Sequence, residues 1–139
     1  MRSESDRLND LTDRAGADQK FAMIPPGTWN VSGTVTLPGG ARGLIMQGTI
    51  RYTGIAPTSV LVLGDGGTIR NAEKLYTGLN VIRQTLSDWS SEADIGITVR
   101  NVDASQIELR RVEGFTIGMR TLGDGRGVDL RGLAADAEA

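Results

Sequence analysis

The sequence predicts an all-β fold, a solenoid in which short strands stack coil upon coil. Three observations support it: nineteen glycines against 4% aromatic residues in 139 positions, Val/Ile/Leu-based runs of four to six residues that end at glycine-containing turns, and an approximate internal repeat. A glycine-rich chain with few aromatic residues is typical of many short strands with frequent turns, not of a helical bundle. We therefore expect one small domain, long enough to bury a core.

One helix is expected at residues 3–15, before the strands begin. Ser3 or Ser5 can serve as its N-cap, acidic residues fall in its first turn, and two leucines lie on one face. Gly16 is expected to end it. Because two apolar anchors make only a thin stripe, we expect the helix to lie across the end of something larger.

From residue 21 onward the pattern changes to period two. After a Pro-Pro-Gly turn, apolar residues at 29, 31, 35 and 37 alternate with polar ones, as in a half-buried strand. Further strands are expected at residues 44–46, 50–52, 60–63, 68–71, 79–82, 96–101, 106–109 and 115–119.

Spacing along the chain indicates the repeat. With Ile45, Ile69, Ile97 and Val128 as successive equivalents, the intervals are 24, 28 and 31 residues. A period in the twenties with three short strands per turn is typical of a strand solenoid. An antiparallel sandwich is the alternative, but its strands are usually joined by Asn-Gly or Asp-Gly hairpin turns. Here the Asp-Gly pairs stand only at intervals the length of a coil.

Composition excludes several functions. Without cysteine there are no disulfides, thiolate metal sites or cysteine nucleophiles, and without histidine there are no Ser-His-Asp triads or HExxH zinc sites. A net charge of -2 removes the electrostatic basis for binding nucleic acid. No run approaches the roughly 18 apolar residues of a membrane span, and no signal peptide is visible. We expect cytoplasmic synthesis, no membrane insertion and no nucleic-acid partner.

Two segments resemble a known family. Residues 24–38, Ile-Pro-Pro-Gly-Thr-Trp-Asn-Val-Ser-Gly-Thr-Val-Thr-Leu-Pro, resemble the opening coil of the pectate-lyase-like superfamily of right-handed parallel β-helices, where a short helix caps the N-terminal end. Residues 101–119 resemble the rungs of bacteriophage tailspikes and related particle spikes. The resemblance implies a right-handed parallel β-helix of about four to five short coils with an N-terminal capping helix. The implied organisation is a cap and lead-in at 1–20, the β-helix at 21–133 and a polar tail at 134–139.

The resemblance also implies a function. It points to a spike or tail-fibre-type structural protein of a phage or phage-like particle that contributes to attachment to the host surface. The expected partners are further copies of the chain, as a homotrimer, cell-surface polysaccharide and other structural proteins of the particle. An open last rung at Val128–Leu133 would need covering by copies or a partner, unless the chain is a shortened relative. The alternatives are a polysaccharide lyase or glycoside hydrolase of the same superfamily, whole or in part, and a non-catalytic carbohydrate-binding module.

The candidate carbohydrate site is the longest insertion between the expected strands, residues 87–94, with three acids and a tryptophan. A Trp face can stack on a pyranose ring while carboxylates bind hydroxyl groups. The residues we expect to bind carbohydrate are Arg83, Asp88, Trp89 and Glu92. The alternative is a solvated loop whose tryptophan packs back over the solenoid.

Catalytic chemistry is weakly supported. Glycoside hydrolysis needs two carboxylates roughly 5 to 9.5 Å apart, a distance that Asp103 and Glu108, or Asp65 and Asp124, could meet across neighbouring coils. However, none of the four galacturonase signatures occurs, and no dense acidic cluster suits Ca²⁺. We expect no catalytic residue, metal or cofactor.

The adjacent cations Arg110 and Arg111 carry two interpretations. They can engage an acidic polysaccharide through paired hydrogen bonds. Alternatively, they are outward strand residues that pair with Glu108 and Glu113 and keep the surface soluble.

Overall fold

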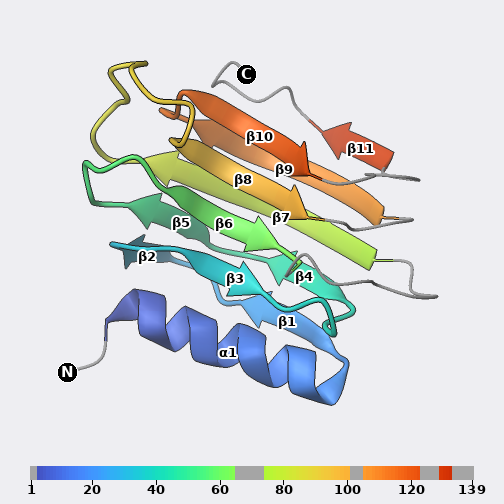
Figure 1. The fold of residues 1–139 in the computed structure, drawn as a ribbon. Helices are drawn as coiled ribbons and strands as arrows, with labels where there is room; N and C mark the ends of the chain where they lie inside the picture. The colour runs from blue at the N-terminus through green and yellow to red at the C-terminus, as the bar shows by residue number, and fades with distance from the viewer. Residues whose placement is uncertain (1–2, 65–73, 101–104, 123–128, 133–139) are drawn as a thin grey trace.

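The computed structural model describes residues 3–64, 74–100, 105–122 and 129–132. In these ranges the chain forms the helix α1 (Glu4–Asp18) and then only strands (Figure 1). The strands are β1 (Phe21–Ile24), β2 (Thr28–Val31), β3 (Val35–Leu37), β4 (Gly43–Met46), β5 (Thr49–Tyr52), β6 (Ser59–Leu63), β7 (Lys74–Arg83), β8 (Ile95–Arg100), β9 (Ser105–Glu113), β10 (Ile117–Leu122) and β11 (Asp129–Gly132).

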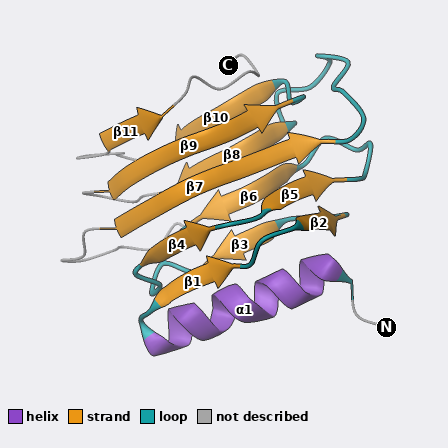
Figure 2. Cartoon of the chain, turned by 180° about the vertical axis from the view of Figure 1, so that it is seen from behind, coloured by secondary structure: helices purple, strands orange, loops and turns teal. Residues whose placement is uncertain are grey.

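The described strands form two sheets, and every pairing between them is parallel. One sheet has seven strands. In it β1, β4, β7, β9 and β11 pair in succession, and β5 pairs with β7 on one side and with β2 on the other. The other has four, in the order β3, β6, β8 and β10. The chain passes from one sheet to the other and back, and each pass pairs with the one before (Figures 1 and 2). The prediction of a mainly β chain with parallel strands is confirmed.

The passes are not uniform, which explains an error in the predicted repeat. The first two passes place two short strands in the seven-stranded sheet, whereas β7 is one strand of ten residues that pairs with both β4 and β5. Ile45 lies in β4 and Ile97 in β8, so they belong to different sheets and are not equivalent. Ile69 and Val128, and with them the strand expected at 68–71, lie outside the described residues.

The core lies between the two sheets. Inward side chains of Val, Ile and Leu fill it, as the period-two pattern predicts. Three aromatic residues are also fully enclosed there: Tyr52, Tyr76 and Phe115. Phe115 precedes β10, so the strand expected at 115–119 begins two residues later than predicted.

Helix α1 lies across one end of the sheets and packs against β1, β2 and β3 (Figure 2). Ser3 is its N-cap and accepts a hydrogen bond from the Asp6 amide, as expected. The predicted end at Gly16 is wrong. The helix continues to Asp18 and stops where Gln19 adopts a left-handed conformation with φ 55°. Gly16 has a packing role instead, because a Cβ there would come within 2.8 Å of Cβ of Pro38.

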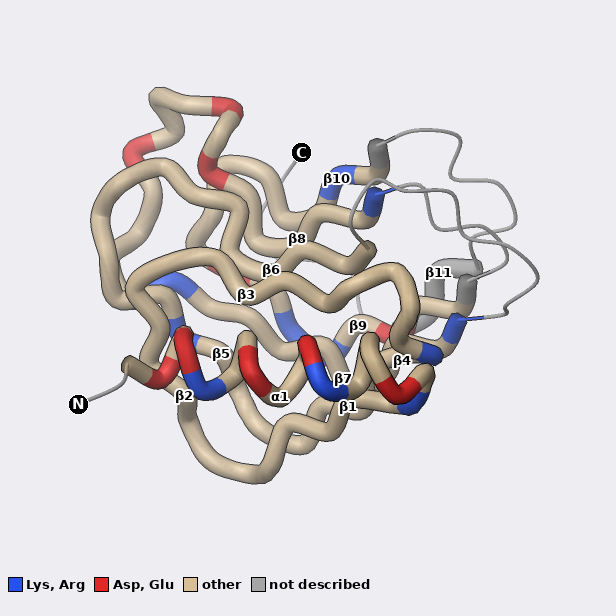
Figure 3. The backbone as a smooth tube through the Cα atoms, turned by 60° about the horizontal axis from the view of Figure 1, so that its bottom comes forward, with Lys and Arg blue, Asp and Glu red and all other residues tan. Residues whose placement is uncertain are grey.

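Polar side chains of α1 bind the backbone of the strands that it covers. Asn9 accepts from the amide of Thr36 at 2.9 Å and donates to the carbonyl of Thr34 at 2.9 Å. Thr12 donates to the Thr36 carbonyl at 2.7 Å, and Ser5 accepts from a β2–β3 loop amide at 3.1 Å. The helix therefore occupies strand-edge groups that would otherwise be open to pairing with another chain. Its outer surface mixes both charges (Figure 3), and no helix in the described ranges is long and apolar enough to cross a membrane.

Candidate functional site

The loop between β7 and β8, residues 84–94, carries three of the four residues expected to bind carbohydrate. Asp88, Trp89 and Glu92 are all exposed, and the Trp89 side chain is 59% exposed. Its ring does not fold back into the core. Trp89 also has φ 64°, in the left-handed region that bulky residues rarely adopt. The loop thus exposes an aromatic ring to solvent while its backbone is strained at the same residue.

Arg83, the fourth expected residue, lies in a different environment. Its guanidinium forms an ion pair with Asp94 at 3.1 Å, and the two side chains are only 4% and 3% exposed. It also donates to the carbonyls of Thr85 and Ile55, and it lies 5.5 Å from the centre of the Tyr52 ring. Because Arg83 precedes the loop and Asp94 ends it, the ion pair closes the base of the loop. Arg83 is a positioning residue in this geometry.

A second set of hydrogen bonds fixes the middle of the loop. The hydroxyl groups of Ser87 and Thr116 lie 2.6 Å apart, and the amide of Trp89 donates to the Ser87 oxygen at 3.0 Å. The Ser87 amide donates to the carbonyl of Gly114 at 2.8 Å. The Thr116 amide donates to Asp94 at 3.3 Å, which links this set to the ion pair. The strained conformation of Trp89 is therefore held by neighbouring structure.

Asp88 forms a tight turn beside the tryptophan. Its carboxylate accepts from the hydroxyl and the amide of Ser90 at 2.5 and 3.0 Å. These bonds, the hydroxyl contribution first, hold the pKa of Asp88 below its usual value. The side chain is thus a stable hydrogen-bond acceptor at neutral pH, and it does not suit a general acid, which needs a raised pKa.

A cleft of about 330 Å³ lies between this loop and the β5–β6 loop. Arg83 and Asp88 both line it. Ile55 and Leu86, which are 77% and 73% exposed, line it too. Trp89 and Glu92 do not line it. The structure therefore places two of the four expected residues, Arg83 and Asp88, around one cleft, and leaves Trp89 and Glu92 on the loop outside it.

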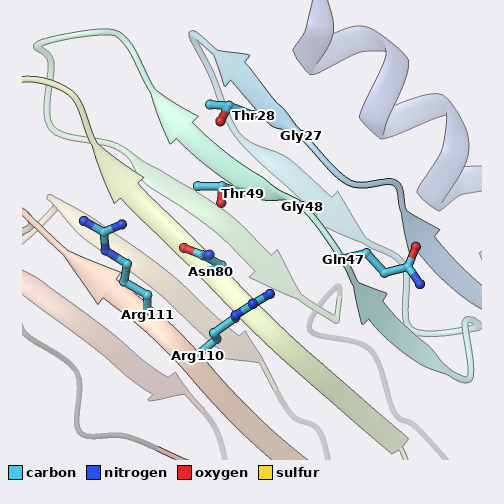
Figure 4. Close-up of a pocket in the computed structure, with 8 residues that line it drawn as sticks. All are labelled: Gly27, Thr28, Gln47, Gly48, Thr49, Asn80, Arg110 and Arg111. Carbon is cyan, nitrogen blue, oxygen red and sulfur yellow. The ribbon is translucent and has the colours of Figure 1, made fainter.

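A second hollow, of about 480 Å³, lies on the outer face of the seven-stranded sheet (Figure 4). Its lining is polar and comes from four strands or the turns beside them: Gly27, Thr28, Gln47, Gly48, Thr49, Asn80, Arg110 and Arg111. Figure 4 shows both arginines reaching from β9 toward β7, on which Asn80 lies.

Sequence reasoning missed most of this hollow. The dipeptide Gly-Thr stands at 27–28 and 48–49, but it also occurs at 33–34 and 67–68, so it does not single out these positions. The structure places Thr28 and Thr49 side by side in register. Of the two interpretations of the arginines, the surface pairing holds for Arg111, which forms an ion pair with Glu113. Glu108, the other carboxylate expected to pair with these arginines, accepts a hydrogen bond from the Thr77 hydroxyl at 3.0 Å.

No group of three or more acidic side chains that could hold a metal ion occurs in the described ranges. Asp65, Asp103 and Asp124, considered above for glycoside hydrolysis, lie outside those ranges. Comparisons with protein-family models, with curated proteins and with solved structures found no match to this chain. The two surfaces described here are therefore the basis for a functional assignment.

Proposed function

We propose that this chain is a right-handed parallel β-helix of the pectate-lyase-like type, acting as a spike-type structural protein of a phage or phage-like particle. In this proposal it contributes to attachment to cell-surface polysaccharide through the loop at 84–94. Two parallel sheets traversed in alternation, with a helix across the first strands, support the architecture. The resemblance of residues 101–119 to tailspike rungs supports the setting.

The observation that carries the proposal is the conformation of Trp89. A non-glycine residue held in the left-handed region costs about 1–3 kcal/mol and clusters at functional sites. Here the strain is maintained by Ser87 and by the Asp88–Ser90 turn, and it directs a large apolar ring toward solvent. An exposed aromatic ring beside acceptor oxygens is the arrangement that binds the apolar face and the hydroxyls of a sugar.

The test compares Trp89→Gly with the wild type. Glycine relieves the strain, so the variant should unfold at higher urea, with a stability gain of about 1 kcal/mol. Binding to a panel of bacterial surface polysaccharides should fall about tenfold or more. Leu86→Ala is the matched control, because it removes an exposed apolar side chain from the same loop. If Trp89→Gly binds polysaccharide as well as the wild type, the loop is not the attachment site.

Self-association as a homotrimer is part of the same proposal. In the described part of the chain β10 pairs with β8 alone. In this proposal a second copy of the chain pairs with the other edge of β10. Light scattering after size exclusion, across a tenfold dilution, should give about three times the chain mass of 14.8 kDa. A stable monomer that binds glycan would favour the carbohydrate-binding module instead.

The lyase or hydrolase alternative gains no support from this loop. Asp94 is held by Arg83, and hydrogen bonds keep the pKa of Asp88 low. Release of reducing ends or unsaturated products from a bound polysaccharide, lost in Asp88→Ala, would restore that alternative.

A further inference from the structure

A groove of about 570 Å³ lies between the helix α1 and the strand β1. Its helical wall extends from Arg7 to Asp18, and its other wall is the chain from Lys20 to Met23. At 1.5 Å per helical residue the first wall is about 16 Å long, which is the length of an extended segment of about five residues. The groove therefore has the dimensions to hold a short strand alongside β1.

The backbone of β1 is oriented to pair with such a strand. β1 is an outermost strand of the seven-stranded sheet, beside α1, and in the described ranges it pairs with β4 alone (Figure 2). The Ile24 carbonyl accepts a hydrogen bond from the amide of Gln47, on the β4 side. In a parallel ladder the N–H and C=O groups of one residue point to one side, and those of the next residue point to the other. The backbone groups of Phe21 and Met23 therefore point away from β4, and both residues line the groove.

Polar side chains of α1 cover the neighbouring strands but not β1. They form hydrogen bonds with the backbone of Asn30, Ser32, Thr34 and Thr36, which lie in or beside β2 and β3. Among the described residues no side chain of α1 forms a hydrogen bond with the backbone of β1. The helix thus blocks strand pairing at β2 and β3 and leaves it possible at β1.

Apolar side chains flank the same edge. Phe21 and Met23 are 39% and 49% exposed, and the half-buried Leu11 of α1 lines the groove with them. Leu75, which is 38% exposed, follows Phe21 across the sheet, because both residues pair with Gly43. A polypeptide suits this surface, since its backbone can pair with the strand edge while its alternate side chains cover the apolar groups.

The charges of the groove favour an acidic partner. Three exposed cations and two acids line it: Arg7, Arg14, Lys20, Asp10 and Asp18. A further exposed cation, Arg42, lies 5.7 Å from the centre of the Phe21 ring. Two copies of the chain joined through β1 would bring these cations together, which disfavours a second copy as the occupant. Carboxylates on the partner would instead be attracted to the groove.

We propose that an acidic, extended segment of a partner protein binds in this groove as an additional strand beside β1. Its backbone pairs with Phe21 and Met23, its alternate apolar side chains cover the exposed apolar groups, and its carboxylates lie near Arg14 and Lys20. The groove shares no residue with the cleft at the 84–94 loop. The inference therefore goes beyond the proposed function and does not depend on polysaccharide binding.

The test uses two peptides with the same apolar residues and opposite charge, acetyl-Glu-Val-Glu-Val-Glu-Val-amide and its counterpart with lysine in place of glutamate. Calorimetry should show the wild type binding the acidic peptide about tenfold more tightly than the basic one. Arg14→Glu/Lys20→Glu should lose this preference. Arg100→Glu reverses the same charge at an exposed position of the other sheet and should keep the preference. Circular dichroism and urea unfolding verify that the variants fold.

Pairing through the backbone is tested with two N-methylated forms of the acidic peptide, one methylated on its valines and the other on its glutamates. Because alternate amides of a strand face opposite edges, only one of the two sets can face β1. One form should therefore bind like the unmodified peptide, and the other should bind about tenfold more weakly or less. In NMR the unmodified peptide should shift the amides of Phe21 and Met23.

Equal affinity for the acidic and basic peptides, or equal binding of the two methylated forms, would overturn the inference. Shifts of the Phe21 and Met23 amides that depend on protein concentration without peptide would assign this edge to a second copy, which also overturns it. The polysaccharide affinity of Trp89→Gly tests the proposed function separately, so failure of one proposal is distinguishable from failure of the other.

Discussion

Replacing Asp94 by asparagine tests whether the buried ion pair at the base of the 84–94 loop stabilises the fold. The substitution is nearly isosteric and keeps an oxygen that can accept from the Thr116 amide, so it removes the charge without opening a cavity. The guanidinium of Arg83, whose side chain is 4% exposed, is then left without its counter-charge. Removing one partner of a buried pair costs about 3–5 kcal/mol.

We expect the lower end of that range, about 3 kcal/mol, because the carbonyls of Ile55 and Thr85 still accept from Arg83. With a urea m-value of about 1.5 kcal/mol/M, the unfolding midpoint should fall by about 2 M. Arg83→Met should cost a similar amount, since it leaves the buried Asp94 carboxylate without its counter-charge.

The double variant Arg83→Met/Asp94→Asn has no buried charge at this position. Its free energy of unfolding should lie within about 1.5 kcal/mol of the wild-type value, because neutral groups of similar size often replace a buried ion pair at little cost in stability. The two single effects would then be strongly non-additive. Additive effects, or a loss below about 1 kcal/mol for Asp94→Asn, would refute the assignment of Arg83 as the residue that anchors this loop.

Three further predictions concern packing and pH. Gly43→Ala should lower the free energy of unfolding in urea by about 3 kcal/mol or more, because the alanine Cβ would overlap a backbone carbonyl of β7. Gly33→Ala is the control and should be tolerated, since open space surrounds that position. Burial, and secondarily the nearby Arg42, lowers the pKa of Lys74 below its usual value of 10.5. Between the two pKa values the unfolded chain binds more protons than the folded chain, so the free energy of unfolding should rise as the pH approaches 10.5. Lys74→Met should abolish this dependence on pH. Because the pKa of Asp88 is lowered, its hydrogen bonds from Ser90 should persist above pH 3.8 and be lost only as the pH falls further. The chemical shift of the Ser90 amide in NMR should report this loss. A transition of that shift near pH 5 would contradict the prediction.

Local sequence predicts the start of the helix α1 but not its end. Its start at Ser3 follows from side-chain capping, which depends on neighbours along the chain. Its end does not, because Gly16 is kept free of a Cβ by the Pro38 turn, which lies more than twenty residues away. The helix continues through the glycine because packing outweighs the local preference.

The two candidate sites differ in the same way. The exposed loop with Asp88 and Trp89 could be found from composition, since an insertion rich in polar residues lies on the surface. The role of Arg83 could not, because its partner Asp94 is brought close only when the loop closes. The hollow depends on the register of β7 and β9, and the bulge that sets this register has no sequence signal of its own.

By itself, the sequence determined a mainly β chain of short parallel strands behind one helix, because period-two patterning and glycine-rich turns act over a few residues. Only the tertiary structure decided which strands share a sheet, why Ile45 and Ile97 are not equivalent, and which arginine is buried and which is exposed. Strand register and ion pairing join residues that are distant in sequence, so they are fixed only when the sheets assemble.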